Sequence, residues 1–358
     1  MGRIPRRAAA WALLLASTAG HALAADPAMP ALTPLPAGSA ALDPHTGTTN
    51  FAFVFAGDNR PASASCQQPP QLGDIVAAIK SSPPSFVLWG GDIIYGKDVD
   101  KAPSEYPAFV QAVQAAGVPV VTVPGNHELS VKGTKKCPVP GKKDKKEKID
   151  EPDPSGKLAA AYQAAIGAPY GMFRFGNAAF IGLDTDDALN GEYDPGDCGY
   201  NGYVGKAQVA ALAGTLDALS ADDSVAHIVV FMHRPLHGRG AKEKDELGPD
   251  SVAAIHALHE LLDWKDAKHW KYPKLSLVLA SHEHLFFAGS GMAAAAGGSL
   301  TRRDPSANGP NYLVSGGAGA PLAHGGEFHF LRIAVNGPTV SVTYVPVADS
   351  SSNCSDAK

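Results

Sequence analysis

Polar residues that can bind metal ions follow several apolar runs of the sequence, each at the point where a strand would end. Aspartate, asparagine and histidine occupy these junctions, namely Asp58, Asp92, Asn126, His233, His282 and His284. A single aspartate in a turn usually only forms the turn. Five such junctions in one chain do not look like turn chemistry, because open α/β sheets bind their ligands at the carboxyl ends of strands. The pattern therefore predicts a metal centre.

The types of these residues indicate which chemistry the centre would support. Mixed carboxylate and imidazole ligands suit iron, manganese or zinc better than calcium. With Tyr95 as a further candidate, there are more ligands than one tetrahedral ion uses. Two ions about 3.5–4 Å apart could clamp the attacking and leaving oxygens in phosphoester hydrolysis. A metal-bound hydroxide would be the nucleophile, since coordination can lower the pKa of water to about 7.

Other polar residues close to these junctions are candidates for catalysis. His127 follows Asn126 and could donate a proton to the leaving group, with Glu128 orienting it. Arg60 could hold a phosphate oxygen, although a surface ion pair is the alternative. His237 could line the pocket as a second proton donor. No Gly-x-Ser-x-Gly motif supplies a serine nucleophile.

The elements that must position these residues alternate between strands and helices. Buried strands are predicted at 51–56, 85–89 and 118–123, with helices at 72–80 and 106–116 between them. This alternation is typical of right-handed βαβ units with a largely parallel sheet. The paired glycines before Asp92 end the second strand sharply and let backbone approach its tip.

The rest of the chain continues with mixed elements. Further helices are predicted at 158–166, 206–219 and 252–264, and further strands at 172–175, 178–183, 226–232, 275–280, 311–315, 328–335 and 340–345. Asp184 and Asp186 are expected to be loop carboxylates. The alanine- and glycine-rich stretch 289–299 is expected to be a flexible insertion, and Gly316 to Gly319 to form a tight turn.

Residues 132–148 interrupt the pattern with eight lysines. One interpretation is a solvated, mobile loop. The other is a cationic rim near the catalytic edge that attracts anionic substrates.

Composition and the amino terminus bear on the cellular location. The formal net charge of −5 over 358 residues argues against general nucleic-acid binding. Residues 1–24 have the features of a signal peptide, which predicts an exported protein, periplasmic or secreted. A proline-rich leader at 25–49 precedes one domain at 50–348 and a tail at 349–358, and no later segment is apolar enough to span a membrane.

Export makes the cysteines candidates for disulfide bonds. The four cysteines are Cys66, Cys137, Cys198 and Cys354. Three pairings are open.

The ordered motifs resemble those of the calcineurin-like metallophosphoesterase superfamily. They are Gly57-Asp58, Gly91-Asp92, Gly125-Asn126-His127-Glu128, His233 and His282-Glu283-His284. The resemblance runs from about Phe51 to His284, and the stretch from Gly316 to Pro321 is also similar. It implies a four-layer α/β/β/α sandwich, in which two mixed sheets are flanked by helices, with a dinuclear metal site at the sheet edge.

The resemblance also assigns roles to the ligands. Asp92 would bridge both metals. Asp58 and His284 would hold one metal. Asn126, His233 and His282 would hold the other.

Two departures from the superfamily pattern are present. Arg60 stands where many members have a histidine ligand, and Ser281 replaces the usual glycine. Tyr95 could supply the missing ligand, because Asp92 to Tyr95 resembles the GDxxY motif of purple acid phosphatases. Tyrosine ligation would imply Fe³⁺ paired with Zn²⁺, Mn²⁺ or Fe²⁺. Otherwise two divalent ions such as Mn²⁺ are expected.

The sequence thus predicts an exported, acid phosphatase-like enzyme that cleaves phosphomonoesters. Its partner would be a small phosphoester substrate, with no nucleic acid and no membrane span in the mature chain. One alternative is a phosphodiesterase acting on nucleotides or phospholipid head groups. An alternative of another class is a non-catalytic phosphate- or metal-binding protein on the same scaffold.

Overall fold

The computed structural model describes a defined part of the chain. The described residues are 28–35, 42, 47–138, 146–187, 202–237, 247, 253–262, 271–288, 292–294, 299–302, 311–323 and 325–350. The expected signal peptide, Cys198 and Cys354 lie outside them.

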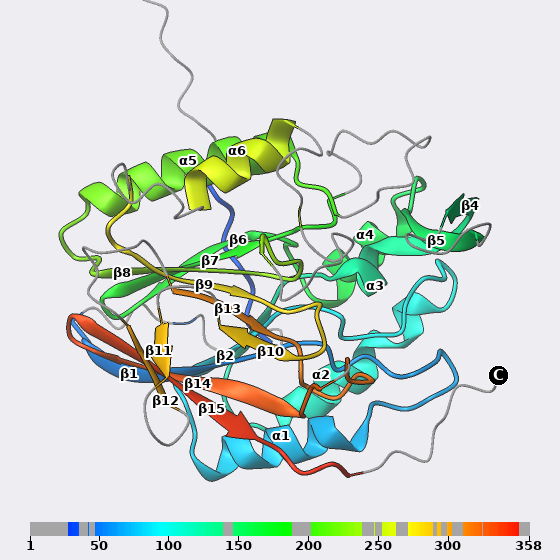
Figure 1. Ribbon diagram of the computed structural model, residues 1–358, viewed down its shortest axis with the longest axis horizontal. Coiled ribbons are helices and arrows are strands. Elements are labelled where there is room, and N and C mark those ends of the chain that lie inside the picture. The colour runs from blue at the N-terminus through cyan, green and yellow to red at the C-terminus, as the bar shows by residue number, and fades with distance from the viewer. Residues whose placement is uncertain are drawn as a thin grey trace, which may run out of the picture.

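Two β-sheets pack face to face at the centre of the molecule (Figure 1). The first has the order β11 (Met292–Ala294), β12 (Ser299–Arg302), β15 (Thr339–Pro346), β14 (His329–Asn336), β1 (Asn50–Ala56), β2 (Phe86–Trp89) and β3 (Val120–Thr122). The second has the order β10 (Phe286–Ala288), β13 (Asn311–Ser315), β9 (Leu275–Ala280), β8 (His227–Met232), β7 (Ala178–Leu183) and β6 (Gly171–Phe175).

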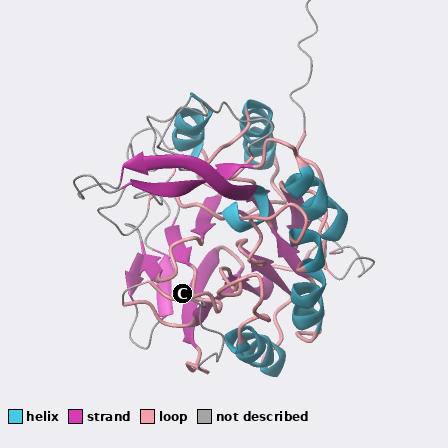
Figure 2. Ribbon diagram, turned by 90° about the vertical axis from the view of Figure 1, so that its right-hand side faces the viewer, coloured by secondary structure: helices cyan, strands magenta, loops and turns pink. Residues whose placement is uncertain are grey.

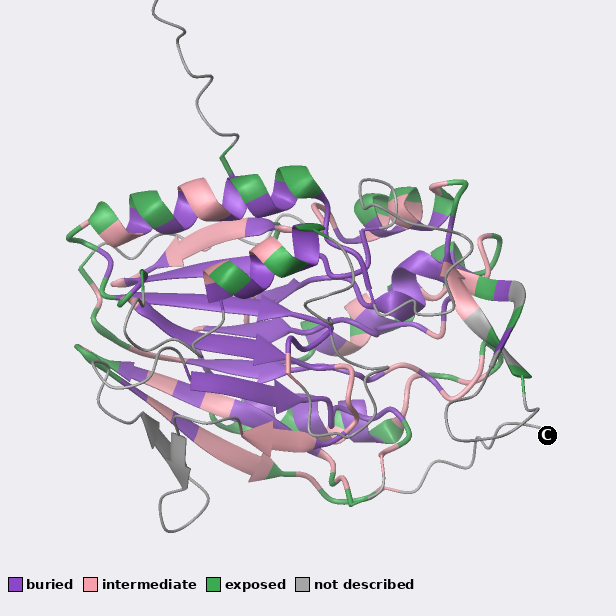
Figure 3. Cartoon of the chain, turned by 45° about the horizontal axis from the view of Figure 1, so that its top comes forward, coloured by how far each residue is buried: buried purple, intermediate pink, exposed green. Residues whose placement is uncertain are grey.

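Helices cover the outer face of each sheet. They are α1 (Pro70–Ser81), α2 (Tyr106–Gln114), α3 (Asn126–Leu129), α4 (Lys157–Ala165), α5 (Lys206–Ala221) and α6 (Ala253–Leu262), with the short 3₁₀ helix η1 (Ala102–Ser104) before α2. One core cluster joins α1, α2 and α4 to the first sheet, and another joins α5 and α6 to the second. Figure 3 shows the buried side of α5 turned towards the strands. The predicted four-layer α/β/β/α sandwich is therefore confirmed.

The centre of each sheet is parallel. β1, β2 and β3 run parallel, as do β7, β8, β9 and β13, while antiparallel strands form the remaining pairs. Within each parallel group the carboxyl ends meet at one edge, so the loops that leave these strands are neighbours.

Phenylalanine rings fill the space between the two sheets. Phe53 stacks on Phe86 with ring centroids 5.5 Å apart, and Phe180 of the second sheet meets Phe86 edge-on at 4.9 Å. All three side chains are fully buried. Because side chains alternate along a strand, the neighbouring Val54 points the other way and packs with the helices of the first sheet.

Part of the proline-rich leader packs into the domain. Leu35 and Val120 exchange two backbone hydrogen bonds of 2.7 and 3.1 Å, and Leu32 bonds to Met172 of β6. Leu32 and Leu35 are buried. The described residues 28–35 therefore bridge both sheets, which the proline-rich composition did not indicate.

One interpretation of the sequence was that the lysine-rich insert is a loop throughout its length. The structure differs from this interpretation. The described ends of the insert form an antiparallel ribbon of β4 (Ser130–Pro138) and β5 (Lys146–Pro152). The stretch 289–299, predicted to be a flexible insertion, contains β11 and the start of β12, which pair with each other and extend the first sheet.

Two further expectations concern cysteines and membranes. Neither described cysteine, Cys66 or Cys137, is a free thiol. The choice among the three pairings involves residues outside the described part. Among the described helices, none is both long and apolar enough to cross a bilayer.

We expect Phe180→Ala to lower the free energy of unfolding by about 3–5 kcal/mol, because it leaves a cavity between the sheets. Phe180→Leu keeps most of the volume and should cost clearly less. Urea denaturation followed by circular dichroism measures both. Equal losses for the two variants would show that the sandwich does not depend on packing at this ring.

Candidate metal centre

Loops at the carboxyl ends of parallel strands bring the predicted ligands together. Asp58 follows β1, Asp92 follows β2 and His233 follows β8, and ligand atoms from these three residues lie within 4.8 Å of one another. All three side chains are buried, with exposed fractions of 0%, 2% and 0%. Asn126 after β3 and His282 after β9 join the same cluster through His233.

The imidazole of His233 is oriented by its own hydrogen bond. Its Nδ1 lies 2.8 Å from the carbonyl oxygen of Gly90, which can only accept, so Nδ1 carries the proton. In the neutral ring, Nε2 then presents a lone pair, which lies 3.1 Å from Oδ1 of Asn126 and 3.4 Å from Oδ1 of Asp92. Nδ1 of His282 also lies 3.0 Å from this Nε2 and donates to it, because Nε2 of His282 accepts from Arg234. The lone pair of Nε2 and the oxygens of Asn126 and Asp92 are ligand atoms that a metal ion could bind together.

The same arrangement occurs around Asp58. Oδ2 of Asp58 accepts the backbone N–H of His282 at 2.7 Å, but Oδ1 is buried and has no hydrogen-bond partner among the described residues. Nε2 of His284 lies 3.4 Å from Oδ1, while Nδ1 donates to the carbonyl of Pro321 at 2.6 Å. Burial works to lower the pKa of His284, but the carboxylate of Asp58 raises it overall, so the two form an ion pair in the metal-free protein. Loss of the Nε2 proton would free a lone pair beside Asp58, and the donor set would then fit a centre of two metal ions.

Asp92 is held by polar contacts on several sides. Its Oδ1 accepts the backbone N–H of His127 at 3.0 Å, and Nε of Arg60 lies 3.7 Å from Oδ2. Burial works to raise the pKa of Asp92, but the neighbouring His233 and Arg60 lower it overall. The carboxylate is thus kept ionised and able to bind metal.

The backbone at three ligands is left-handed. The φ angles of Asp58, Asp92 and His282 are 63°, 52° and 69°. Residues other than glycine adopt this conformation at an energetic cost, and such strain tends to occur at functional sites. Close packing adds to the constraint, since a Cβ on Gly125 would collide with Oδ1 of Asp92.

Glu128 fixes two of the ligand loops. Its carboxylate accepts the backbone N–H groups of Asp92, Ile93, Ile94 and Gly125, at 2.9, 2.9, 3.1 and 2.6 Å. Burial, with the charge of Asp92, raises the pKa of Glu128 to about 8, and the N–H bonds oppose this shift. Glu128 was expected to orient His127. Its carboxylate instead holds the loop that follows Asp92 against the loop that carries Asn126.

His127 lies beside the ligand cluster. Its Nδ1 donates to the backbone carbonyl of Tyr95, and Nε2 lies 3.9 Å from Oδ2 of Asp92. Burial, followed by the charges of Arg60 and Lys97, holds the pKa of His127 well below its usual range. The ring is therefore neutral, with the lone pair of Nε2 turned towards the centre.

Tyr95 and His237 have other neighbours. The ring of Tyr95 lies between the ring of His127, at a centroid distance of 5.8 Å, and Nζ of Lys132, at 5.5 Å. His237 packs its ring against His259 and Tyr312, at 5.4 and 5.9 Å. Metal ligation by Tyr95 and proton donation by His237 stay predictions.

A buried ion pair next to the cluster was not predicted. Nε of Arg234 lies 2.9 and 3.1 Å from the two carboxylate oxygens of Asp186, and Nη1 lies 3.2 Å from Nε2 of His282. Asp186 lies in the loop after β7, as predicted, but it is fully buried. The available signal was that both residues follow strand ends, Arg234 directly after His233.

Ser281 also has a role that the sequence did not suggest. Its hydroxyl donates to the carbonyl of Gly90 at 2.5 Å, and its Cβ would lie 2.8 Å from a Cβ placed on Gly57. The serine thus ties the loop after β9 to the loop after β2, with glycines providing the space.

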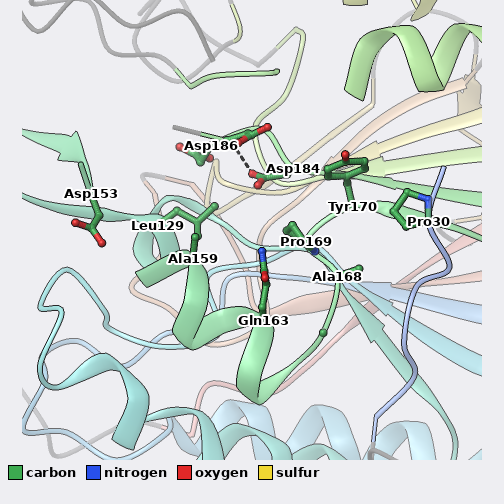
Figure 4. A pocket seen from close by; sticks show the side chains of 12 residues that line it. Pro30, Leu129, Asp153, Ala159, Gln163, Ala168, Pro169, Tyr170, Asp184 and Asp186 are labelled. Atoms are coloured by element: carbon green, nitrogen blue, oxygen red, sulfur yellow. Dashed lines mark hydrogen bonds between the residues drawn. The ribbon is translucent and has the colours of Figure 1, made fainter. Parts of the chain in front are cut away.

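A cavity of about 540 Å³ lies beside the ligand loops. Figure 4 shows Leu129 of α3, Tyr170, Asp184 and Asp186 at its wall. Burial, followed by the charge of Asp187, raises the pKa of Asp184 well above its usual range. Since Asp186 pairs with Arg234, this wall adjoins the residues around His282.

A family model described as calcineurin-like phosphoesterase matches residues 43–286, more than half of the chain. The chain belongs to the calcineurin-like phosphoesterase family. The resemblance stated from the sequence motifs is confirmed, and membership indicates a metal-dependent phosphoester hydrolase with a dinuclear metal centre. No curated protein sequence matches the chain.

Several solved structures are similar to this phosphoesterase at low sequence identity. A dimetal phosphatase from Danio rerio matches with a TM-score of 0.49 and 13% identity, over 83% of this chain and 99% of that chain. PhoD matches with a TM-score of 0.49 and 16% identity, over 82% of this chain and 65% of that chain. A protein of Thermus thermophilus, TT1561, matches with a TM-score of 0.43 and 13% identity, over 83% of this chain and 99% of that chain.

We expect Glu128→Gln to destabilise the metal-free protein by about 1–3 kcal/mol, because the amide nitrogen cannot accept the backbone N–H bonds. Metal affinity should fall as the ligand loops loosen. The matched control is Glu105→Gln, since only one oxygen of Glu105 accepts N–H bonds, from Tyr95 and Gly96. Urea denaturation and metal titration measure both. Equal behaviour of the two variants would contradict the role assigned to Glu128.

Proposed function

We propose that this protein is an exported phosphohydrolase that cleaves phosphomonoesters. The observation that carries the proposal is the set of buried carboxylate, amide and imidazole ligand atoms that converge around Asp92. Two bound metal ions would supply an activated water and positive charge for the phosphoryl group. Asp58, Asp92, Asn126, His233, His282 and His284 would hold them.

The residues around the ligand set support hydrolysis of a phosphoester. The guanidinium of Arg60 lies beside Asp92 and its side chain is 19% exposed, so it can contact a phosphate oxygen from the solvent side. Nε2 of His127 is turned towards the same place. To donate to the leaving group it must first take up a proton, and the negative charge of a bound phosphoester would favour that uptake.

The alternative of another class, a non-catalytic phosphate- or metal-binding protein, predicts that a ligand position is missing. Each of the five motif positions carries a side chain that can bind metal. A phosphodiesterase acting on nucleotides or phospholipid head groups remains the alternative within hydrolases. Rates on matched aryl monoester and aryl diester substrates decide between them, and a faster diester reaction would reject the monoester assignment.

Two finer parts of the proposal have direct tests. Export predicts that the mature protein begins after Ala24 or Ala25, which amino-terminal sequencing of the processed protein measures. Tyr95→Phe decides between the two sets of metals. A visible absorption band that this variant loses would assign Fe³⁺ ligation, whereas a colourless, fully active wild type with two divalent ions would exclude it.

We expect Asp92→Ala to abolish hydrolysis and to lower the content of both metals, because the carboxylate lies between the two groups of ligands. Metal analysis and aryl phosphate turnover measure the two effects. Asp98→Ala is the control, since the side chain of Asp98 is 39% exposed and pairs only with Lys101 among its described charged neighbours. A folded, metal-replete Asp92→Ala protein with normal turnover would refute the dinuclear centre.

We expect His127→Ala to retain both metals and to lose about a hundredfold or more in kcat on esters with poor leaving groups. The loss should shrink for good leaving groups, which need less protonation. The exposed His256→Ala is the control. Loss of metal from His127→Ala would instead make His127 a ligand.

A further inference from the structure

The ribbon of β4 and β5 begins next to the candidate metal centre. β4 directly follows α3, which carries Asn126 and His127. Lys97 forms a backbone bridge with Val131 and an ion pair with Asp150, so the base of the ribbon is attached to the loop that follows Asp92. Figure 2, which looks at the right-hand side of Figure 1, shows the two strands extending across this side.

The strand register gathers lysines on one face of the ribbon. Lys136 lies directly opposite Lys148, and Lys146 is two residues from Lys148 on the same strand. Because cross-strand partners and alternate residues share a face, these three lysines point to the same side. All three are exposed, while Cys137 of the other face is 2% exposed. The lysine face therefore looks outward.

Like charges directly opposite each other destabilise an antiparallel pair. The acidic residues nearest in the register do not offset the Lys136–Lys148 pair. In the strand register Glu147 pairs with Cys137 and not with a lysine, and Asp150 is paired with Lys97. A face with this charge is stabilised by an anion bound across both strands.

We propose that this lysine face binds a linear polyanion, such as a chain of phosphate groups, as part of substrate recognition. The inference rests on the proposed function, because it names the substrate class of the same site. A linear chain fits better than a membrane. The face is two strands wide, about 5 Å between strands, and its described residues include no aromatic or long aliphatic side chain that could insert into a bilayer.

The position of the ribbon connects this face to the reaction site. Nζ of Lys132, near the base of β4, lies over the ring of Tyr95 three residues past Asp92. A chain bound along the ribbon can therefore reach the metal centre with one end. Small phosphomonoesters do not extend that far and should react independently of the ribbon.

The test compares Lys136→Gln/Lys148→Gln with the wild type in the metal-loaded full chain. Inorganic polyphosphate is the probe, and calorimetry at several salt concentrations measures its Kd. We expect about tenfold weaker binding at low salt. The slope of log Kd against log salt should fall by about two, and kcat/KM for an aryl phosphate should stay within about twofold. Removing the like-charge pair should not lower the urea midpoint.

The matched control is Lys80→Gln/Lys271→Gln, which removes the same charge from exposed lysines that precede β2 and β9, at the opposite ends of the strands. It should bind polyphosphate as the wild type does. Equal weakening in both double variants, or unchanged binding in the ribbon variant, overturns the proposal. Lysine-dependent binding of vesicles with phosphatidylglycerol, without binding of polyphosphate, also overturns it in favour of a membrane surface.

The same experiment separates this proposal from the proposed function. A wild type that binds polyphosphate through Lys136 and Lys148 but does not hydrolyse aryl phosphates would refute the hydrolase and keep the binding face. An active enzyme with no lysine-dependent binding would refute the face and keep the hydrolase.

Discussion

Electrostatic repulsion among buried acceptors is the constraint on which the rest of this structure depends. The carboxylates of Asp58 and Asp92, the amide oxygen of Asn126 and the lone pair of His233 meet where all four side chains are buried. Bringing such groups together without a cation costs free energy. When metal is absent, other contacts of the folded protein must offset this unfavourable free energy. Metal binding removes it and thereby raises the free energy of unfolding.

Contacts that do not involve the metals offset the repulsion among the ligands. Glu128 bonds to four backbone N–H groups and joins the loops of Asp92 and Asn126. Ser281 joins the loop after β9 to that after β2. Left-handed backbone at three ligands turns their side chains inward over glycines that leave space for them. The ligand geometry is thus set by the loops before any ion binds.

Charge beyond the ligands divides this edge into two regions. In one region, Asp186 and Arg234 form a buried pair against His282, and Asp186 also lines the cavity. In the other region, the lysines of the β4–β5 ribbon face outward. An anionic substrate would be attracted by the second region.

The sequence by itself determined the central strands of both sheets, the longer helices and the identity of the candidate ligands. Buried strands such as β1 and amphipathic helices such as α1 are encoded in local apolar spacing, and the ligands follow strand ends within ordered motifs. Only the tertiary structure decided the role of Glu128, the pairing of Asp186 with Arg234 and the lysine face of the ribbon. Each depends on residues far apart in the chain, or on a strand register that composition does not specify. The packing of Leu32 and Leu35 against both sheets was also decided by the tertiary structure. Isolated leucines in a proline-rich segment form no periodic pattern, so their burial depends on the surfaces that they contact.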